Sequence, residues 1–228
     1  MSLNDVMADV SLVKDEAKLL RDGHDYKGAI VLLQQGVELI NRSGWEKGLG
    51  AGSQPTDAQR KMAWHLADCY GMLGGNYRRA NDLENAIRAF DLGRACEEDP
   101  RLRVSSSYNT VNAIVARIES GRGVVASHIK VLRLATATLE RQIFDPEMAA
   151  DSRRADRWAW ADLGLCKLLS GDEEGALAAY RRFAELGDAA SIRSSSEVLQ
   201  RLADTLEKHG DSAAALARRG IDFLHAKT

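Results

Sequence analysis

The sequence predicts an all-α protein, and three observations carry this prediction. Apolar residues recur at spacings of three and four along most of the 228-residue chain, which is the period of an amphipathic helix. Only three prolines occur, and proline is scarce in helices because its ring removes a hydrogen-bond donor and clashes with the preceding turn. Alanine, leucine, arginine and glutamate, which are good helix formers, are abundant.

The apolar spacing places the helices in order, and capping residues support several of their starts. Asp57 follows Pro55 and Thr56, Asp82 caps the next run, and Asp145-Pro146 puts a cap before a proline at the first helical position. The predicted helices are 4–21, 25–41, 57–79, 82–97, 103–119, 123–143, 146–169, 172–186, 192–208 and 211–225.

A turn signature recurs between paired helices. The segments "RDGHDYKGA", "RRANDLENA", "LSGDEEGA" and "KHGDSAAA" each hold an aspartate with an alanine four residues later. Four recurrences of one signature predict an internal repeat. We therefore expect a single domain over 1–228, built from the helix pairs 4–41, 57–97, 103–143, 146–186 and 192–225.

The segment 42–56, "RSGWEKGLGAGSQPT" with Arg42 included, is the longest predicted loop because glycine and serine dominate it. Trp45 is the large apolar residue within it. We expect Trp45 to fold back onto the helices, with an exposed contact as the alternative.

Composition excludes several classes of function. With 31 basic against 33 acidic residues and a pI near 6.2, the chain has no field to gather nucleic acid or anionic lipid. Its three cysteines are widely spaced and form no CxxC motif, which favours packing residues in a reducing compartment. Acidic residues interrupt the first twenty positions, and no stretch approaches a membrane span. We expect a cytoplasmic protein.

The stretch 70–100 matches a known pattern of large and small residues. A face of large, large, small and large side chains is followed, after the turn, by a small residue and an aromatic one. The residues are Tyr70, Leu73, Gly74 and Tyr77, then Ala86 and Phe90, with Pro100 closing the unit. This pattern resembles the tetratricopeptide repeat (TPR) family. The resemblance implies a right-handed superhelical stack of about five antiparallel helix pairs.

A second match lies in 146–186 and weaker ones at the two ends. Its residues are Trp160, Leu163, Gly164, Ala176 and Tyr180, whereas 4–41 and 192–225 lack the aromatics. The pair 103–143 lacks the Leu-Gly and alanine marks, so it is either a divergent repeat or merely helical. In physical terms, Gly74 and Gly164 are expected to let the partner helix approach through Ala86 and Ala176.

Two other interpretations, a phosphate-binding loop and a metal site, have weaker support in the sequence than the helical repeat. "GMLGGNYRR" lacks the lysine and the serine or threonine of a phosphate-binding loop, and no strand precedes it. His65 and Cys69, spaced i, i+4, would supply two metal ligands, but no further ligand has suitable spacing nearby. We expect no metal, no cofactor and no enzymatic activity.

The resemblance implies a protein-interaction role, as an adaptor or regulatory subunit of the kind that stand-alone bacterial arrays supply. The first helices of successive pairs would line a concave groove that grips a peptide or helix, with an acidic one as one option. The groove residues implied are Lys14, Lys18, Arg21, Asp68, Gly75, Arg78 and Arg79.

Other readings stay open at this point. A mostly apolar stripe, either covered by neighbouring helices or open to an amphipathic helix, comprises Trp158, Ala161, Leu165 and Leu168. A self-assembling protein, such as a homodimer, would use such a stripe. A sensor of a small anionic ligand would use the arginines.

Overall fold

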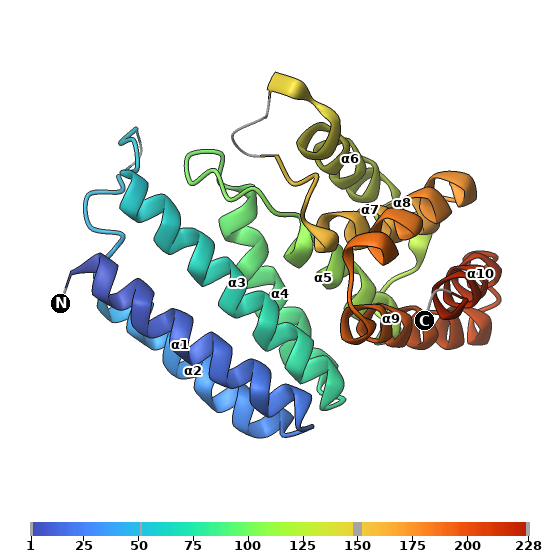
Figure 1. Cartoon of the computed structure of the whole chain (residues 1–228), viewed down its shortest axis with the longest axis horizontal. Helices are drawn as coiled ribbons and strands as arrows, with labels where there is room; N and C mark the ends of the chain where they lie inside the picture. Colours follow the sequence, from blue (N-terminus) through green and yellow to red (C-terminus); the bar gives the residue numbers. More distant parts are fainter. Residues whose placement is uncertain (1, 51, 148–151, 227–228) are drawn as a thin grey trace. The chain divides into compact units, whose positions relative to one another are not determined.

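The computed structural model describes residues 2–50, 52–147 and 152–226, and within them the chain is helical without any strand (Figure 1). The all-α prediction is confirmed. The ten helices of the described residues are α1 (Leu3–Asp22), α2 (Tyr26–Arg42), α3 (Asp57–Arg79), α4 (Leu83–Glu98), α5 (Tyr108–Glu119), α6 (Val125–Phe144), α7 (Arg157–Leu169), α8 (Glu173–Leu186), α9 (Ala189–Lys208) and α10 (Ala213–His225).

The chain divides into two compact units, Met1–Ser105 and Ser106–Thr228, and each is described by itself. Helices α1–α4 belong to the first unit and α5–α10 to the second. The expectation of a single domain over 1–228 stays a prediction.

In the first unit α3 is central, because α1, α2 and α4 all pack against it. Helices α1 and α2 also pack along each other, and Figure 1 shows the four helices side by side. Two clusters of buried side chains hold them together. One includes Val10 and Met62, and the other includes Ala17 and Leu33.

Trp45 folds back onto the helices of the first unit. Its side chain is buried in the cluster that contains Val10 and Met62. Its carbonyl oxygen accepts a hydrogen bond from Gln59 Nε2 at 2.9 Å, which ties the 42–56 loop to the first turn of α3. The alternative of an exposed Trp45 is therefore wrong.

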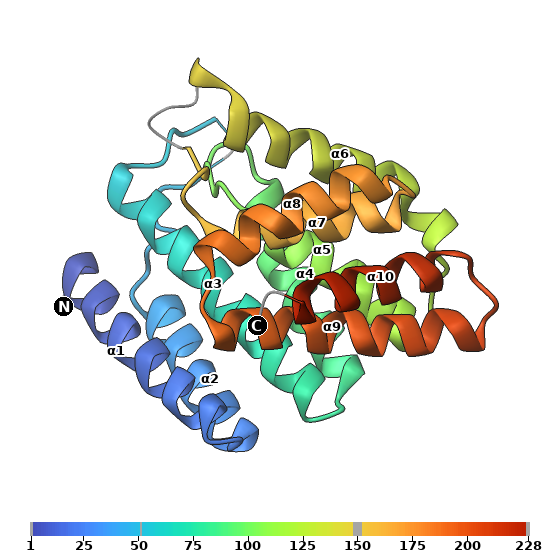
Figure 2. The ribbon, with the colours of Figure 1, turned by 45° about the vertical axis from the view of Figure 1, so that its right-hand side comes forward.

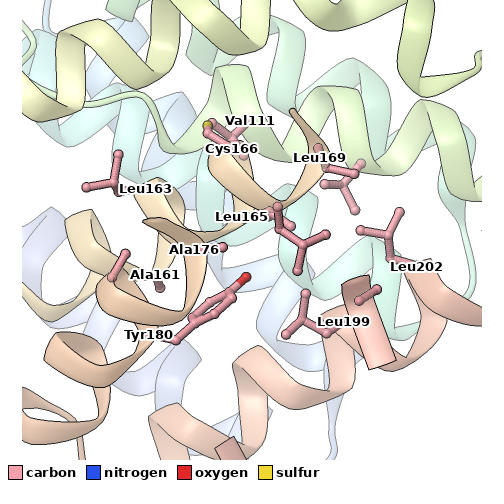
Figure 3. Packing of buried hydrophobic residues seen from close by; sticks show 14 of the residues in the cluster. Val111, Ala161, Leu163, Leu165, Cys166, Leu169, Ala176, Tyr180, Leu199 and Leu202 are labelled. Atoms are coloured by element: carbon pink, nitrogen blue, oxygen red, sulfur yellow. The ribbon is translucent and has the colours of Figure 1, made fainter. Parts of the chain in front are cut away.

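The second unit is built round α7, which is buried on most of its circumference. Helices α5, α6, α8 and α10 pack against α7, and α9 packs against α10 and α5 (Figure 2). Figure 3 shows this core from close by, with the Tyr180 ring of α8 beside Leu165 of α7 and Leu199 of α9. The Tyr180 side chain is buried in this core, and its burial raises the pKa of the Tyr180 hydroxyl.

Four turns share one backbone geometry, and they are the four that the sequence singles out. In each, the aspartate N–H donates to the carbonyl five residues earlier at 2.8–2.9 Å. The residue before the aspartate has a positive φ, which closes the preceding helix. These residues are His24 (64°), Asn81 (62°), Gly171 (83°) and Gly210 (66°).

The aspartates then start the next helices. Asp25, Asp82 and Asp172 each accept a hydrogen bond from the backbone N–H three residues on, as N-caps do. Asp211 accepts from the N–H of Ala213 instead. The turn signature of the sequence thus corresponds to one repeated helix stop followed by a cap.

The turn after α5 shares only the first half of this geometry. Gly121 has a φ of 71°, and the N–H of Arg122 donates to the Arg117 carbonyl at 2.9 Å, as in the other four turns. An arginine stands where they have aspartate, and Val124 makes no side-chain cap for α6. The middle pair therefore keeps the helix stop and lacks the cap.

Gly74 and Gly164 each leave room for an aromatic ring. A Cβ built on Gly74 would lie 2.5 Å from Phe90 Cε1, and one built on Gly164 would lie 2.8 Å from Tyr180 Cε1. Both separations are far below van der Waals contact, so only glycine fits the present packing. The atoms nearest to both added Cβ positions belong to the aromatic ring sixteen residues on, and the expected approach of the partner helix through Ala86 and Ala176 stays a prediction.

The first helix pair solves the same packing problem with other residues. Ala17 lies eight residues before Asp25, as Gly74 lies eight before Asp82, and Leu33 lies sixteen after Ala17. Ala17 and Leu33 are fully buried in one cluster. A larger residue on one helix is thus combined with a smaller one on the other.

The structure corrects two predicted helix starts. The predicted helix 146–169 begins at Arg157, because Asp156 accepts from the Trp158 N–H at 2.9 Å and caps the helix there. Asp145 instead ends α6 and accepts from the Glu147 N–H. Residues 148–151 of this prediction lie outside the described residues. The predicted helix 103–119 begins at Tyr108.

Residues 99–105 are drawn into the first unit. Leu102 and Val104 are buried in the same cluster as Trp45. Arg103 between them has a φ of 51°, in the left-handed region that opposes a continued helix. Packing of these two side chains accounts for the late start of α5.

Candidate functional site

A buried lysine joins α1 to α3 in the first unit. Lys14 is only 6% exposed, and its ammonium donates to Asp68 Oδ2 at 2.7 Å. Desolvating an ammonium is costly unless an opposite charge lies close to it, so Asp68 offsets the burial of Lys14. Lys14 and Asp68 were both predicted as site residues, and the structure brings them together.

His65 takes a second hydrogen bond from the same ammonium. Its Nδ1 lies 3.1 Å from Lys14 Nζ. An ammonium has no acceptor, so the Nδ1 that faces it carries no proton. Burial is the largest effect that lowers the pKa of His65; the Lys14 charge adds to it and Asp68 opposes it.

Trp64 contacts both Lys14 and His65. Lys14 Nζ lies 4.7 Å from the centroid of the Trp64 ring, within the range of a cation–π interaction. The ring meets His65 edge to face, with centroids 5.1 Å apart and planes at 81°. Trp64 nevertheless keeps 47% of its surface exposed. We call Lys14, Trp64, His65 and Asp68 the Lys14 cluster.

Cys69 lies next to Asp68 on α3 and is buried. Burial raises the pKa of its thiol to about 12. A buried thiol with a raised pKa has little thiolate at neutral pH, which is typical of a cysteine that packs in a core. Among the described residues, no three His, Cys, Asp or Glu side chains come together to hold a metal ion.

The basic residues that were predicted to line the groove on the first helix pair with acidic residues of the protein itself. Lys14 is neutralised by Asp68, Lys18 pairs with Asp15 at 2.9 Å, and Arg21 pairs with Asp22 at 2.8 Å. Lys18 remains half exposed. The three cations of the first helix therefore all have an acidic partner in the protein, and Lys14 is the one that is buried.

The arginines at the end of α3 do not line an open surface either. Arg78 is 4% exposed and Gly75 is buried, because α3 is buried on most of its circumference over 71–78. Arg79 is half-buried and donates to the Gly75 carbonyl at 3.3 Å, one turn back. Their expected role as an exposed charged groove is corrected on this ground.

The apolar stripe of the second unit is covered. Ala161 and Leu165 are buried in the core of that unit (Figure 3). Leu168 is buried in the same core, and Trp158 packs against it half-buried. The Trp158 ring lies 6.0 Å from that of Phe183 on α8. Neighbouring helices therefore cover the stripe, and its use as an open groove is excluded.

A shallow hollow of about 220 Å³ lies between α2, α3 and α4. Tyr70, Leu73 and Tyr77 of α3 form part of its lining, and Gln34 Nε2 donates to the Tyr77 hydroxyl at 3.0 Å. Leu92 at its edge is half exposed. The aromatic residues that define the repeat pattern thus also shape a surface depression.

Trp64 and His65 are functional candidates that the sequence analysis did not place in a site with Lys14. Trp64 is one of four tryptophans, and it stands four residues before Asp68, so both lie on one side of α3. The signal was therefore present, but only the packing of α1 on α3 shows that Lys14 meets them.

No helix within 2–50, 52–147 and 152–226 has both the length and the apolar character that a membrane crossing needs.

Comparisons with known proteins leave the family open. No protein-family model matches the chain, and no curated protein matches it. Among solved structures, the chain is similar to the crystal structure of BtubC (BKLC) from P. vanneervenii. The identity is 15%, covering 100% of this chain and 91% of that one, with a TM-score of 0.36. A likeness this remote carries no argument about fold or function.

Proposed function

We propose that this chain is a TPR-like array of antiparallel helix pairs that binds a peptide or helix of another protein. Two features support the repeat architecture. One turn geometry recurs four times, and a glycine meets an aromatic ring sixteen residues later in both the second and the fourth predicted pair. The proposed role is binding without catalysis.

The observation that carries the binding role is the exposed Trp64 of the Lys14 cluster. Interface hot spots are enriched in tryptophan, tyrosine and arginine that are held rigidly before binding. Lys14 below and His65 beside it hold the Trp64 ring in place at little further entropic cost. In this proposal a partner side chain packs on Trp64, while Lys18 and Asp68 give polar contacts at its rim.

This proposal relocates the contact surface. The groove implied by the resemblance relied on the charges of Lys14, Lys18, Arg78 and Arg79, and the revised surface is centred on Trp64. It keeps the first helices of successive pairs, α1 and α3, as the lining elements. The ligand remains a peptide or helix, and its main anchor becomes an apolar or aromatic side chain.

Affinity capture with mass spectrometry tests the proposal. The native protein is compared with Trp64→Ser and with Leu134→Ser, a control because Leu134 is an exposed apolar residue of the second unit (69% exposed, against 47% for Trp64). We expect Trp64→Ser to lose partners that Leu134→Ser retains. Circular dichroism confirms that both variants stay folded. Recovery of the same proteins by Trp64→Ser at unchanged yield would contradict the proposal.

A further inference from the structure

Helix α1 has a second face that no element of the first unit covers. Its buried residues are Val6, Val10, Lys14 and Ala17. On the opposite side, Leu12 is 69% exposed and Leu19 is 73% exposed. The two leucines are seven residues apart, so they lie in one row along the helix, about 10 Å from each other. We call them the α1 ridge.

Two acidic rows flank the α1 ridge. One row consists of Asp9 and Glu16, and the other row consists of Asp15 and Asp22. The two residues of each row are seven positions apart, as the two leucines are. At 100° per residue each row lies about 60° round the helix from the ridge. All four acids are exposed.

Part of this acidic charge is neutralised locally. Asp15 pairs with Lys18 and Asp22 with Arg21. Asp9 and Glu16 belong to no ion pair among the described residues, and Asp5 extends the ridge row toward the N-terminus. The exposed surface of α1 therefore carries a net negative charge around two leucines.

The pattern selects one kind of occupant. Apolar side chains at positions i and i+7 are typical anchors when one helix binds to another. A second copy of the chain would set these acidic rows against identical ones, and like charges across an interface are costly. An anionic lipid surface is disfavoured for the same reason. A helix with lysines or arginines on both sides of a leucine row complements the surface.

We propose that the α1 ridge and its two acidic rows form a docking surface for a basic amphipathic helix of a partner protein. This surface lies on the side of α1 opposite to Lys14, so it is separate from the Lys14 cluster and independent of the proposed role of Trp64. In this proposal the two leucines provide apolar contact area. Asp9 and Glu16 align the partner helix along α1 and select for a positively charged one.

Two synthetic peptides probe the surface. One carries leucines at helical spacing with lysines on the other positions, and the second has glutamates in place of the lysines. Each is labelled with a fluorophore and titrated with the full chain at about 50 mM salt, where surface charges are weakly screened, with anisotropy as the readout. We expect the lysine peptide to bind at least about tenfold more tightly than the glutamate peptide.

Variants assign the binding to α1. Leu12→Ser/Leu19→Ser and Asp9→Lys/Glu16→Lys should each weaken the lysine peptide by about tenfold, because each removes one of the two contributions. Leu134→Ser, at an exposed leucine of the second unit, should leave it unchanged. These exposed positions tolerate substitution, and circular dichroism verifies the fold.

Three outcomes would overturn the proposal. The two peptides bind equally, or the α1 variants bind the lysine peptide as the native chain does. Alternatively, sedimentation shows a native dimer that Leu12→Ser/Leu19→Ser dissociates, in which case a second copy occupies the ridge.

Discussion

Replacement of Gly74 by alanine tests the packing on which the helix-pair architecture depends. The new Cβ would lie 2.5–2.7 Å from three atoms of the Phe90 ring, which is fully buried. Overpacking of a core typically costs about 1–3 kcal/mol, and so deep an overlap belongs near the upper end. Alanine is favoured over glycine inside a helix by about 1 kcal/mol. The net expectation is a loss of about 2 kcal/mol in the free energy of unfolding.

The first helix pair supplies the matched rescue. Its equivalent positions hold Ala17 and Leu33, so Gly74→Ala/Phe90→Leu reproduces a combination that this protein already uses. Phe90→Leu alone should cost about 1–2 kcal/mol, through the volume it leaves empty. The double variant should lose less than the sum of the two, with a coupling of about 2 kcal/mol.

Urea unfolding followed by circular dichroism measures all four proteins of this cycle. Gly74→Val serves as an upper bound, since a larger side chain deepens the same overlap. The reasoning would be refuted if Gly74→Ala stabilised the protein by the helix-propensity gain alone, or if the coupling fell within about 0.5 kcal/mol of zero.

Two further predictions concern the Lys14 cluster. Asp68→Asn should cost about 1–3 kcal/mol in urea unfolding because it leaves the Lys14 ammonium buried without its counter-charge, whereas Lys14→Met should cost less because the 40%-exposed Asp68 regains water. If the two variants lost the same free energy of unfolding, the argument that Lys14 depends on its partner more than Asp68 does would be contradicted. Because the folded-state pKa of His65 is lowered, the unfolded chain takes up its proton first, and stability should fall as the pH drops below about 6.5. His65→Gln should reduce this fall in thermal melts between pH 7.5 and 5.5, and an NMR titration midpoint of His65 above that of a free histidine would contradict the assignment.

Much of the local structure could be predicted from the sequence. The three-and-four spacing locates ten helices, and Asp25, Asp82 and Asp172 mark helix starts because an N-cap depends only on its own backbone neighbours. The start of α7 was missed for a related reason. Asp145-Pro146 and Asp156 are both plausible caps, and local chemistry does not choose between them.

The site was harder to predict, because charge on a sequence says nothing of burial. Lys14, Arg78 and Trp64 all lie on helices whose period is clear. Lys14 and Arg78 turn out to be buried, while Trp64 is exposed. Helical spacing gives the side of the helix on which a residue lies, and the neighbouring helix decides whether that side meets water.

The sequence by itself determined the helices, their caps and the recurrence of one turn, since these follow from interactions between residues at most six apart. It also marked Gly74 and Gly164 as places of close approach. Only the tertiary structure decided that Phe90 and Tyr180 fill those places, that Asp68 neutralises Lys14, and that the ridge of α1 stays open. These outcomes depend on contacts between helices distant in sequence, and such contacts are set by the packing of whole faces against each other.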